Sequence, residues 1–403
     1  MTQRPLEGVR IADFTWAWAG PYGTMLLAFM GTEVIKIEST KRPDHARMRS
    51  LASGPSFGGP DHAPFFNDLN LNKMSITLDL SQPRAVELAK RVVNISDVVA
   101  ENFRPGVMDK LGLGYEALKE VKPDIIMLSS SAVGGTGPQR HYVGYAPTFA
   151  ALGGMAHLTG YPDGPPVPLM GSSDLRSATT SAFAIIVALY HRAQTGEGQH
   201  IDLSSTETIA VLTGEALLDY TMNGRIPSRK GNRDEIMAPH NCCPCRENGW
   251  VSIAIATEEE WKGFCDALGN PPWTKDERFA DAFQRWQNQD ELDKLIGEWT
   301  TNHTHREVME RLQKAGVAAV PSFGGLELFS DPHLKERGFA TEVAHPVIGK
   351  RIVIDVPWRF SSTPAQVTRY APLLGEHNEY VFGELLGMPQ EEIQRLVAEG
   401  VIN

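Results

Sequence analysis

The chain has 403 residues, of which 42% are hydrophobic and 22% are charged, so it can bury the cores of two domains or of one domain with a large insertion. Its formal net charge of −11 argues against general nucleic-acid binding, which needs a basic surface. Only four cysteines occur, and we recognise neither a signal peptide nor an apolar run of membrane-spanning length, so we expect a cytoplasmic protein without a disulfide framework.

Strand and helix patterns alternate over the first half of the chain. Residues 9–15 and 33–38 are predicted to be buried strands, and 19–31 to be the helix that joins them. Further elements are strands over 75–80, 97–103, 124–133 and 198–204, helices between them, and a long helix over 175–195. Repeated strand–helix–strand units predict an α/β fold with a Rossmann-like parallel sheet, in which ligands bind at the carboxyl ends of the strands.

The pattern changes after a polar linker at residues 224–241. The segment CCPCRENGWVSIAIA that follows predicts a β-hairpin. Short helices are expected over 257–268, 287–300 and 304–315, and a second hairpin over 342–358. We therefore predict three parts: 1–225 as the N-terminal part of a large Rossmann-like domain, 226–324 as a small α+β domain, and 325–403 as a segment that returns to the large domain.

Three motif matches have simpler explanations than a function. GPSFG at 54–58 matches the nucleophile elbow of hydrolases, but no strand precedes it, and its glycines and proline explain a turn. Cys242, Cys243 and Cys245 lack the C-x-x-C spacing of structural zinc sites and suit packing in a hairpin. The first strand–helix–strand unit offers Glu38 as the ribose acid of a dehydrogenase, but the G-x-G-x-x-G fingerprint is missing.

One acid stands where the long helix is predicted to begin. Asp174 precedes that helix, and the simplest interpretation is an N-cap. The same setting suits a nucleophile, because a helix N-terminus favours a charged carboxylate and the preceding loop, 160–173, is stiffened by four prolines. A carboxylate can attack an activated acyl group and form a mixed anhydride. On the residues alone, both interpretations stay open.

Several motifs in order resemble one enzyme family, the class III CoA transferases, which include formyl-CoA transferase and have CoA-dependent racemases as relatives. The matching segments are GVRIADFT, AGPYGTMLLAFMGTEVIKIE, NLNKMSITLDL, DVVAENFRPGVMDKLGLGYEAL, GGTGP and TGYPDGPP, then an aspartate before ALYHRAQTGEGQHIDLS. The resemblance implies a Rossmann-like large domain formed by both chain ends, a smaller domain between them, and two interlocked chains.

The resemblance also implies a reaction and a nucleophile. The family's aspartate attacks a donor acyl-CoA thioester, which gives an aspartyl mixed anhydride and releases coenzyme A, and Asp174 occupies that position. A closed site and backbone donors must protect and stabilise such an intermediate, for which Gly134 and Gly135 are candidates. The reaction needs no metal, and the only cofactor expected is coenzyme A, as part of the substrate.

The family's ligand contacts carry over by position. The expected coenzyme A contacts are Trp18, Ala19, Asn102, Phe103, Arg104, Lys110, Ser131, Ala132 and Val133. The expected substrate pocket is lined by Trp18, Tyr145, Gly134 and Gly135.

Departures from the family pattern narrow the substrate. Trp18 stands where formyl-CoA transferase has a glutamine, and its indole offers apolar area, so a larger, partly apolar acid is expected rather than oxalate or formate. Ser39 replaces a phosphate-binding arginine, although Lys41 and Arg42 are close. Tyr145 stands where the racemases carry a histidine base, and a phenol is a poor base at neutral pH.

Together these features predict an acyl-CoA:carboxylate CoA-transferase with an aspartyl mixed anhydride. The expected donor is succinyl-CoA, and the expected acceptor is an aryl- or alkyl-substituted succinate. A 2-methylacyl-CoA racemase and a CoA-binding subunit of a heteromeric transferase are the alternatives. The expected partner is a second copy of the chain or a related subunit, with no nucleic acid or membrane.

Overall fold

The structure is a computed structural model that describes residues 4–48 and 58–403. It consists of two compact units. The larger unit comprises Met1–Ala156, Pro168–Ile226 and Lys335–Asn403, and the smaller unit comprises His157–Val167 and Pro227–Leu334. The boundaries expected from the sequence, after residues 225 and 324, stay a prediction. Four of the five GPSFG residues, 54–57, lie outside the described residues.

The larger unit is built on a six-stranded sheet. Its strands are β1 (Arg10–Asp13), β2 (Glu33–Glu38), β3 (Met74–Thr77), β4 (Val98–Glu101), β5 (Ile126–Ser131) and β6 (His200–Ser204). They lie in the order β3-β2-β1-β4-β5-β6, and every neighbouring pair is parallel. The direction of winding reverses between β1 and β4, as in doubly wound folds. The α/β, Rossmann-like fold class predicted from the sequence is therefore confirmed.

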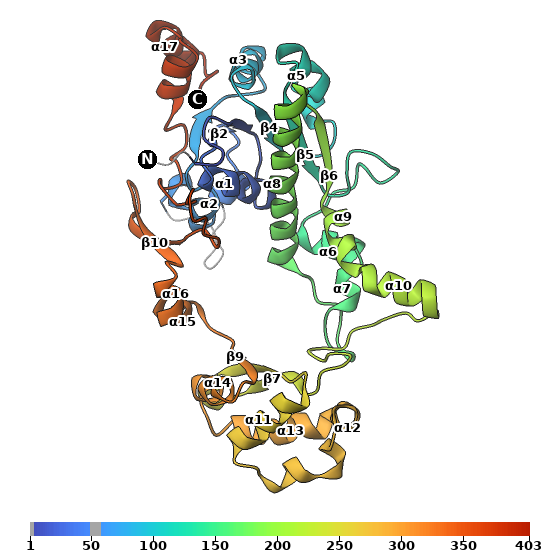
Figure 1. The fold of residues 1–403 in the computed structure, drawn as a ribbon. Helices are drawn as coiled ribbons and strands as arrows, with labels where there is room; N and C mark the ends of the chain where they lie inside the picture. The colour runs from blue at the N-terminus through green and yellow to red at the C-terminus, as the bar shows by residue number, and fades with distance from the viewer. Residues whose placement is uncertain (1–3, 49–57) are drawn as a thin grey trace. The chain divides into compact units, whose positions relative to one another are not determined.

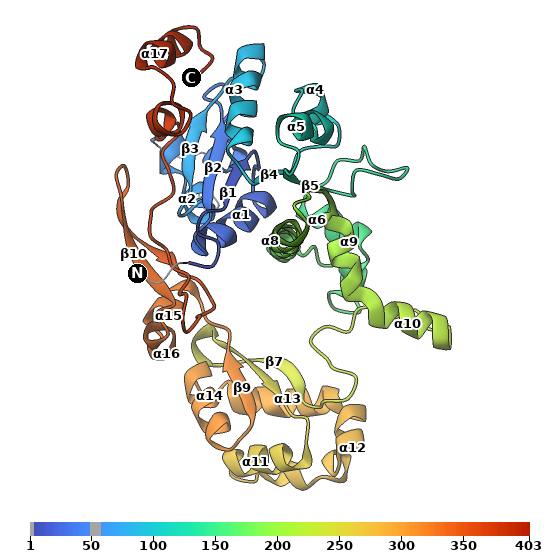
Figure 2. The same cartoon turned by 45° about the horizontal axis from the view of Figure 1, so that its top comes forward.

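Helices cover both faces of this sheet (Figure 1, Figure 2). On one face, α1 (Ala19–Phe29) and α8 (Met170–Thr195) bury apolar side chains against β1, β4 and β5. The other face is covered by α3 (Pro83–Asn94), α5 (Tyr115–Val121), the π-helix Glu379–Leu385 and α17 (Gln390–Ala398). Phe382 and Leu396 lie in the same core as Ile35 and Val99, so both chain ends contribute to the larger unit.

Shorter elements complete the larger unit and the junctions of the chain. The helices are α2 (Pro64–Leu69), α4 (Val107–Lys110), α6 (Ala146–Leu152), α7 (Met155–Leu158), α9 (Ser205–Ala210), α10 (Gly214–Asn223) and α16 (Pro332–Glu336). Three-residue or four-residue 3₁₀ helices cover His45–Met48, Pro60–His62 and Val211–Thr213. An antiparallel hairpin joins β10 (Ala340–His345) to β11 (Gly349–Ile354). In the described part of the chain, no helix has the length and apolar character needed to cross a membrane.

The smaller unit is an α+β structure with its own core. Its antiparallel sheet contains β7 (His240–Pro244), β8 (Trp250–Ala254) and β9 (Ala318–Pro321). Its helices are α11 (Glu258–Leu268), α12 (Ala282–Gln287), α13 (Gln289–Thr300), α14 (His305–Lys314) and α15 (Gly325–Ser330), with 3₁₀ turns at Arg246–Asn248, Pro272–Lys275 and Glu277–Phe279. The predicted hairpin is formed by β7 and β8, and it turns at Glu247 and Asn248, which both have positive φ.

Candidate active site

The loop between β1 and α1 is held by hydrogen bonds, and it lies where the direction of winding reverses between β1 and β4. Asn102, which follows β4, accepts a hydrogen bond from the Trp16 N–H (2.7 Å) and donates one to the Trp16 carbonyl (2.8 Å). The next residue, Ala17, has φ of 68°, and its N–H donates to Oδ1 of Asp44 at 2.8 Å. The backbone that leads into α1 is therefore held from two sides, at the edge where doubly wound sheets bind ligands.

Trp18 connects this loop to the start of α8. Its indole packs edge-to-face on Phe65, with the ring centroids 5.1 Å apart. A Cβ atom added to Gly171 would lie 3.1 Å from Cη2 of Trp18, so the glycine lets the indole approach the first turn of α8. A Cβ at Gly23 would likewise lie 3.0 Å from the Ala178 carbonyl oxygen, which explains the close approach of α1 to α8.

Asp174 lies inside α8, one turn after the residue that Trp18 contacts. The helix begins at Met170, not at residue 175, and Leu169 is its N-cap. The N-cap interpretation of Asp174 is therefore wrong. The side chain is partly buried, and desolvation raises its pKa to about 6. Within residues 4–48 and 58–403, no hydrogen bond or ion pair engages its carboxylate, so Asp174 is free to act on a ligand.

Three buried ion pairs stabilise the part of the larger unit that carries the loop between β1 and α1. The Lys36–Asp44, Arg47–Glu38 and Lys73–Asp13 pairs have N–O distances of 2.9, 2.9 and 3.0 Å, and none of the six side chains is exposed.

Two of these pairs keep the acids Asp13 and Glu38 ionised. Burial works to raise the pKa of Asp13, but Lys73 and Lys36 outweigh it and hold that pKa below its usual value. Burial and Arg47 act in the same opposed way on Glu38, whose pKa is lowered. Glu38 is therefore occupied inside the protein and does not suit the role of a ribose-binding acid.

The loop after β4 carries three of the residues expected to contact coenzyme A. Glu101, which the sequence analysis overlooked, accepts the Phe103 N–H at 2.7 Å, and burial raises its pKa to about 7. The Phe103 ring packs edge-to-face on Trp16 at 5.4 Å. Arg104 and Lys110 are exposed. The Phe103 ring of this loop is thus held in place, and no ion pair engages Arg104 or Lys110 among the residues that the structure describes.

Two cations, Lys41 and Arg42, lie close to Ser39 in the chain. Lys41 is in an ion pair, and Arg42 faces the Trp16 ring. The Lys41 ammonium pairs with Asp79 at 2.6 Å. The Arg42 guanidinium lies 5.4 Å from the centre of the Trp16 ring. Arg42 is therefore better placed than Lys41 to meet a ligand at this edge.

The third loop, after β5, differs in part from its expected role. Ser131 ends β5 beside Ser204, and its hydroxyl is buried without a hydrogen-bond partner in the described part of the chain. The Gly135 N–H donates to the Asp202 carboxylate at 2.7 Å, so this amide is not free to stabilise an oxyanion. Gly134, at φ of 87°, remains the better candidate donor.

Ala132 and Val133 follow Ser131 in this loop, and both are partly exposed. Tyr145 precedes α6, and 63% of it is exposed. Helix α6 packs against α8, which keeps Tyr145 on an element adjoining the helix of Asp174.

The expected residues therefore gather at the ends of three neighbouring strands. Trp18 and Ala19 follow β1, Asn102 follows β4, and Ser131 ends β5. Contacts tie the first two loops together through Trp16, and the Trp18 indole reaches α8. The ion pair between Asp44 and Lys36 could not be predicted from the sequence, because it depends on the fold and no local sequence pattern indicates it.

The cysteines belong to a different part of the molecule. Cys243 and Cys245 lie in the core of the smaller unit, and burial raises their pKa values to about 12 and about 11. Cys242 and Cys243 are neighbours in β7, so their side chains point to opposite faces of the sheet. This arrangement fits packing rather than a shared metal site.

Comparisons with known proteins agree with one another. A family model described as CoA-transferase family III matches residues 6–378. Succinyl-CoA–D-citramalate CoA-transferase from Chloroflexus aurantiacus is 35% identical, over 99% of this chain and 98% of that protein. The beta subunit of succinyl-CoA–L-malate CoA-transferase from the same organism is 32% identical, over 100% and 99%. A crystal structure of a CAIB/BAIF family protein from Brucella suis matches with a TM-score of 0.85 at 31% identity, over 95% of this chain and 100% of that chain.

Proposed function

The chain belongs to CoA-transferase family III, and we propose that Asp174 is the nucleophile of its transfer reaction. One observation carries the proposal. Asp174 is a partly buried carboxylate with a pKa of about 6 and no counter-ion in the described part of the chain. Such a group is mostly ionised at neutral pH, and because it is poorly solvated it is more reactive than an exposed carboxylate.

The proposed reaction proceeds by acyl exchange. An Asp174 oxygen attacks the thioester carbonyl of the donor, the carbon–sulfur bond breaks, and coenzyme A leaves as a thiolate. The acceptor carboxylate then attacks the side-chain carbonyl carbon of Asp174, and the bond from that carbon to the donor oxygen breaks. The donor acid leaves as a carboxylate, and the acceptor acyl group remains on Asp174 as a new mixed anhydride. The thiolate attacks that acyl group, forms the new thioester and regenerates the carboxylate. The energy of the thioester is kept only if water is excluded from the anhydride.

The loops at the carboxyl ends of β1, β4 and β5 are the proposed binding site for coenzyme A. Trp18 and Ala19 would line its thioester end, and Phe103 a flanking surface. Arg104 and Lys110 are exposed cations suited to phosphate oxygens. Ser131, Ala132, Val133 and Gly134 border the remaining edge, with Gly134 as the candidate oxyanion donor.

For the substrates, we propose succinyl-CoA as donor and a substituted four-carbon dicarboxylate as acceptor. The two relatives are named for D-citramalate and L-malate, which are both hydroxysuccinates, and citramalate carries an additional methyl group. The Trp18 indole suits such an apolar substituent. Aryl- and longer alkyl-succinates, expected from the sequence, belong to the same chemical class and should be screened beside them.

A trapping experiment tests the nucleophile. Wild-type protein incubated with succinyl-CoA and hydroxylamine should give a hydroxamate on the peptide that contains Asp174, detected by mass spectrometry. Asp174→Ala should give none, and Asp163→Ala, which removes an exposed acid that precedes Asp174 in the chain, should behave as wild type. Transfer by Asp174→Ala, or trapping at another residue, would refute the proposal. Deuterium exchange at the α-carbon without transfer would instead indicate a racemase.

We also propose that the active protein contains a second chain. Four apolar residues of α8, spaced along one helix face, are exposed: Phe183 (68%), Ile186 (41%), Val187 (48%) and Tyr190 (70%). Leu217, Leu218 and Met222 of α10 are exposed as well. A homodimer or a heteromer would cover these faces. Sedimentation velocity should show an assembly, and activity that requires a related subunit would identify a heteromer.

A further inference from the structure

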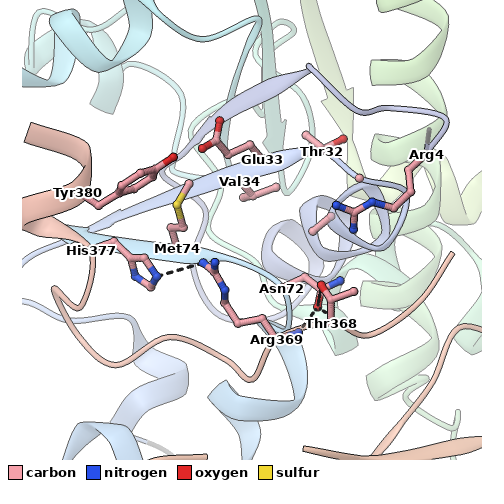
Figure 3. Close-up of a pocket in the computed structure, with 12 residues that line it drawn as sticks. Arg4, Thr32, Glu33, Val34, Asn72, Met74, Thr368, Arg369, His377 and Tyr380 are labelled. Carbon is pink, nitrogen blue, oxygen red and sulfur yellow. Dashed lines mark hydrogen bonds between the residues drawn. The ribbon is translucent and has the colours of Figure 1, made fainter. Parts of the chain in front are cut away.

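A cavity of about 280 Å³, drawn in Figure 3, lies at the edge of the six-stranded sheet where β2 and β3 begin. Glu33 and Val34 at the start of β2, and Met74 at the start of β3, contribute to its wall. The six residues of β2 span about 17 Å from this edge to the edge of the candidate active site. The cavity is therefore separate from the proposed transfer site, and nothing in the proposed reaction uses it.

The charge of the cavity is positive. Glu33, its acid, is already paired, because it accepts a hydrogen bond from Nε of Arg10 at 2.6 Å. Arg4 and Arg369 also line the cavity. In residues 4–48 and 58–403, neither guanidinium has a carboxylate within 4.0 Å, so two cations face the cavity without compensation.

The acid nearest to Arg369 along the chain is engaged elsewhere. Glu376 accepts hydrogen bonds from the Tyr370 hydroxyl (2.6 Å) and from the Leu373 N–H (2.8 Å). Arg369 instead lies with Nη1 at 3.1 Å from Nε2 of His377. Burial lowers the pKa of His377, so this imidazole is neutral at pH 7 and leaves the charge of Arg369 intact.

The wall that carries Arg369 is held firmly against the sheet. Oδ1 of Asn72 accepts the N–H groups of Thr368 (2.7 Å) and Arg369 (2.9 Å), and its Nδ2 donates to the Gln366 carbonyl (2.9 Å). The Asn72 N–H also donates to the Arg369 carbonyl at 3.1 Å. The backbone below Arg369 is therefore ordered before any ligand arrives, which reduces the entropy lost on binding.

Neutral hydrogen-bonding groups complete the lining. Thr32 and Thr368 provide hydroxyls, and the Thr32 hydroxyl has no hydrogen-bond partner among the residues that the structure describes. Tyr380 supplies a phenol. Figure 3 shows Arg4 and Arg369 reaching the cavity from different sides, one from the chain start and one from the C-terminal segment.

From these features we infer that the cavity binds a small dianion rich in oxygen acceptors, at a site distinct from that of Asp174. Two guanidinium groups on different sides suit two carboxylates of a short acid or the several oxygens of a phosphate, because arginine binds both through paired hydrogen bonds. Bound there, the dianion links the segment around Arg4 to the segment around Arg369 and stabilises the larger unit.

Calorimetric titration of the full-length protein tests this inference. The probes are succinate, inorganic phosphate and, as a monoanion, acetate, at constant ionic strength. We expect one dianion to bind with a millimolar dissociation constant and acetate to bind at least about tenfold more weakly. The Arg4→Gln/Arg369→Gln double variant should weaken dianion binding at least about tenfold, whereas Arg311→Gln/Arg337→Gln, which removes the same charge from positions that do not line the cavity, should not.

The titration results identify the class of ligand and distinguish the cavity from the proposed transfer site. Stronger binding of succinate identifies a dicarboxylate site, and stronger binding of phosphate identifies a phosphate site. Equal weakening in both double variants, no effect in either, or equal affinity for acetate would overturn the inference. Succinate binding that is fully retained in the Arg4→Gln/Arg369→Gln variant would overturn the inference and leave the proposal for Asp174 untouched, so failure of one proposal does not imply failure of the other.

Discussion

The two ends of the strands in the six-stranded sheet differ in the sign of the charged side chains that lack an ion-pair partner. Near the carboxyl edge, the buried cations Lys36 and Arg47 are paired, and Asp174 is a partly buried acid without a partner in the described structure. At the amino edge the acid, Glu33, is paired, and the cations Arg4 and Arg369 lack a carboxylate.

This contrast distinguishes ionised side chains that stabilise the fold in ion pairs from unpaired ionised side chains that are suited to contact a ligand. A buried ion must be compensated, because an isolated charge in a protein interior is strongly destabilising. A partly buried carboxylate without a partner, such as Asp174, has either a shifted pKa or a ligand to meet. Arg4 is partly buried and Arg369 is exposed, and both line the same cavity. The free carboxylate suits attack on an electrophilic acyl group, and the free guanidinium groups suit an anion. The predictions below test each side of the contrast.

The largest effect is expected at the unpaired acid. Asp174→Asn keeps the shape of the side chain but removes the nucleophile, so kcat for transfer should fall at least about 10,000-fold. In the wild type, kcat/KM should decline about tenfold per pH unit below pH 6, because burial raises the pKa of Asp174 to about 6 and the protonated acid cannot attack. Steady-state kinetics over pH 4.5–8.5 measures both. Asp163→Asn is the control, and a variant with wild-type kcat would contradict the role.

The next largest effect is expected at a buried pair. Lys73→Met leaves the Asp13 carboxylate buried without its partner and should lower the free energy of unfolding by about 3–5 kcal/mol. Arg84→Met breaks the exposed pair with Glu399 and should change it by less than about 1 kcal/mol. Urea unfolding followed by circular dichroism measures both. Equal losses for the two variants would show that buried and exposed charges are not distinguished in this way.

Much of the fold could be predicted, because it depends on local patterns. Runs such as VRIADFT and EVIKIE are rich in the apolar and β-branched residues typical of buried strands, and a helical segment separates them. That β1 lies beside β4 could not be derived from any local pattern, since it depends on the order of strands far apart in the chain. The family resemblance, rather than periodicity, brought Trp18, Asn102 and Ser131 together.

The details of the site were harder to predict for physical reasons. Gly171, Ser172 and Ser173 have poor helix propensity and follow four prolines, so the sequence predicts a loop there. In the structure they belong to α8, where packing of Trp18 on Gly171 compensates for weak local preference. The partners Asp13 and Lys73 are 60 residues apart, and the cavity of Arg4 and Arg369 joins the two ends of the chain. Such long-range pairings have no signature in a single sequence.

A stability measurement tests the cost of keeping Asp174 unpaired. Its pKa in the folded protein, about 6, exceeds the ordinary value of 3.8, so the folded state binds the proton more tightly than the unfolded state does. This contribution to stability is complete below pH 3.8 and is lost as the pH rises through 6.

Asp174→Asn should therefore be more stable than the wild type by about 2 kcal/mol at pH 8, allowing for partial exposure of the side chain, and about equally stable near pH 4. Urea unfolding of both proteins at the two pH values measures this. A pH-independent difference would indicate a packing effect of the amide, and Asp163→Asn should show no difference at either pH.

The smallest effect concerns the indole that lies against the helix of Asp174. If Trp18 contacts the acceptor's substituent, Trp18→Gln replaces apolar area with an amide and weakens the preference for a methyl-substituted acid. One methyl group buried against apolar surface contributes about 0.8 kcal/mol, which corresponds to about a fourfold change in relative kcat/KM for citramalate over malate. Trp18→Phe should keep the preference, and Trp286→Gln, in the smaller unit, should not alter it. If Trp18→Gln leaves the ratio unchanged while Asp174→Asn abolishes transfer, the carboxylate is the nucleophile but the acyl substituent lies away from the indole, and the apolar wall must come from another loop.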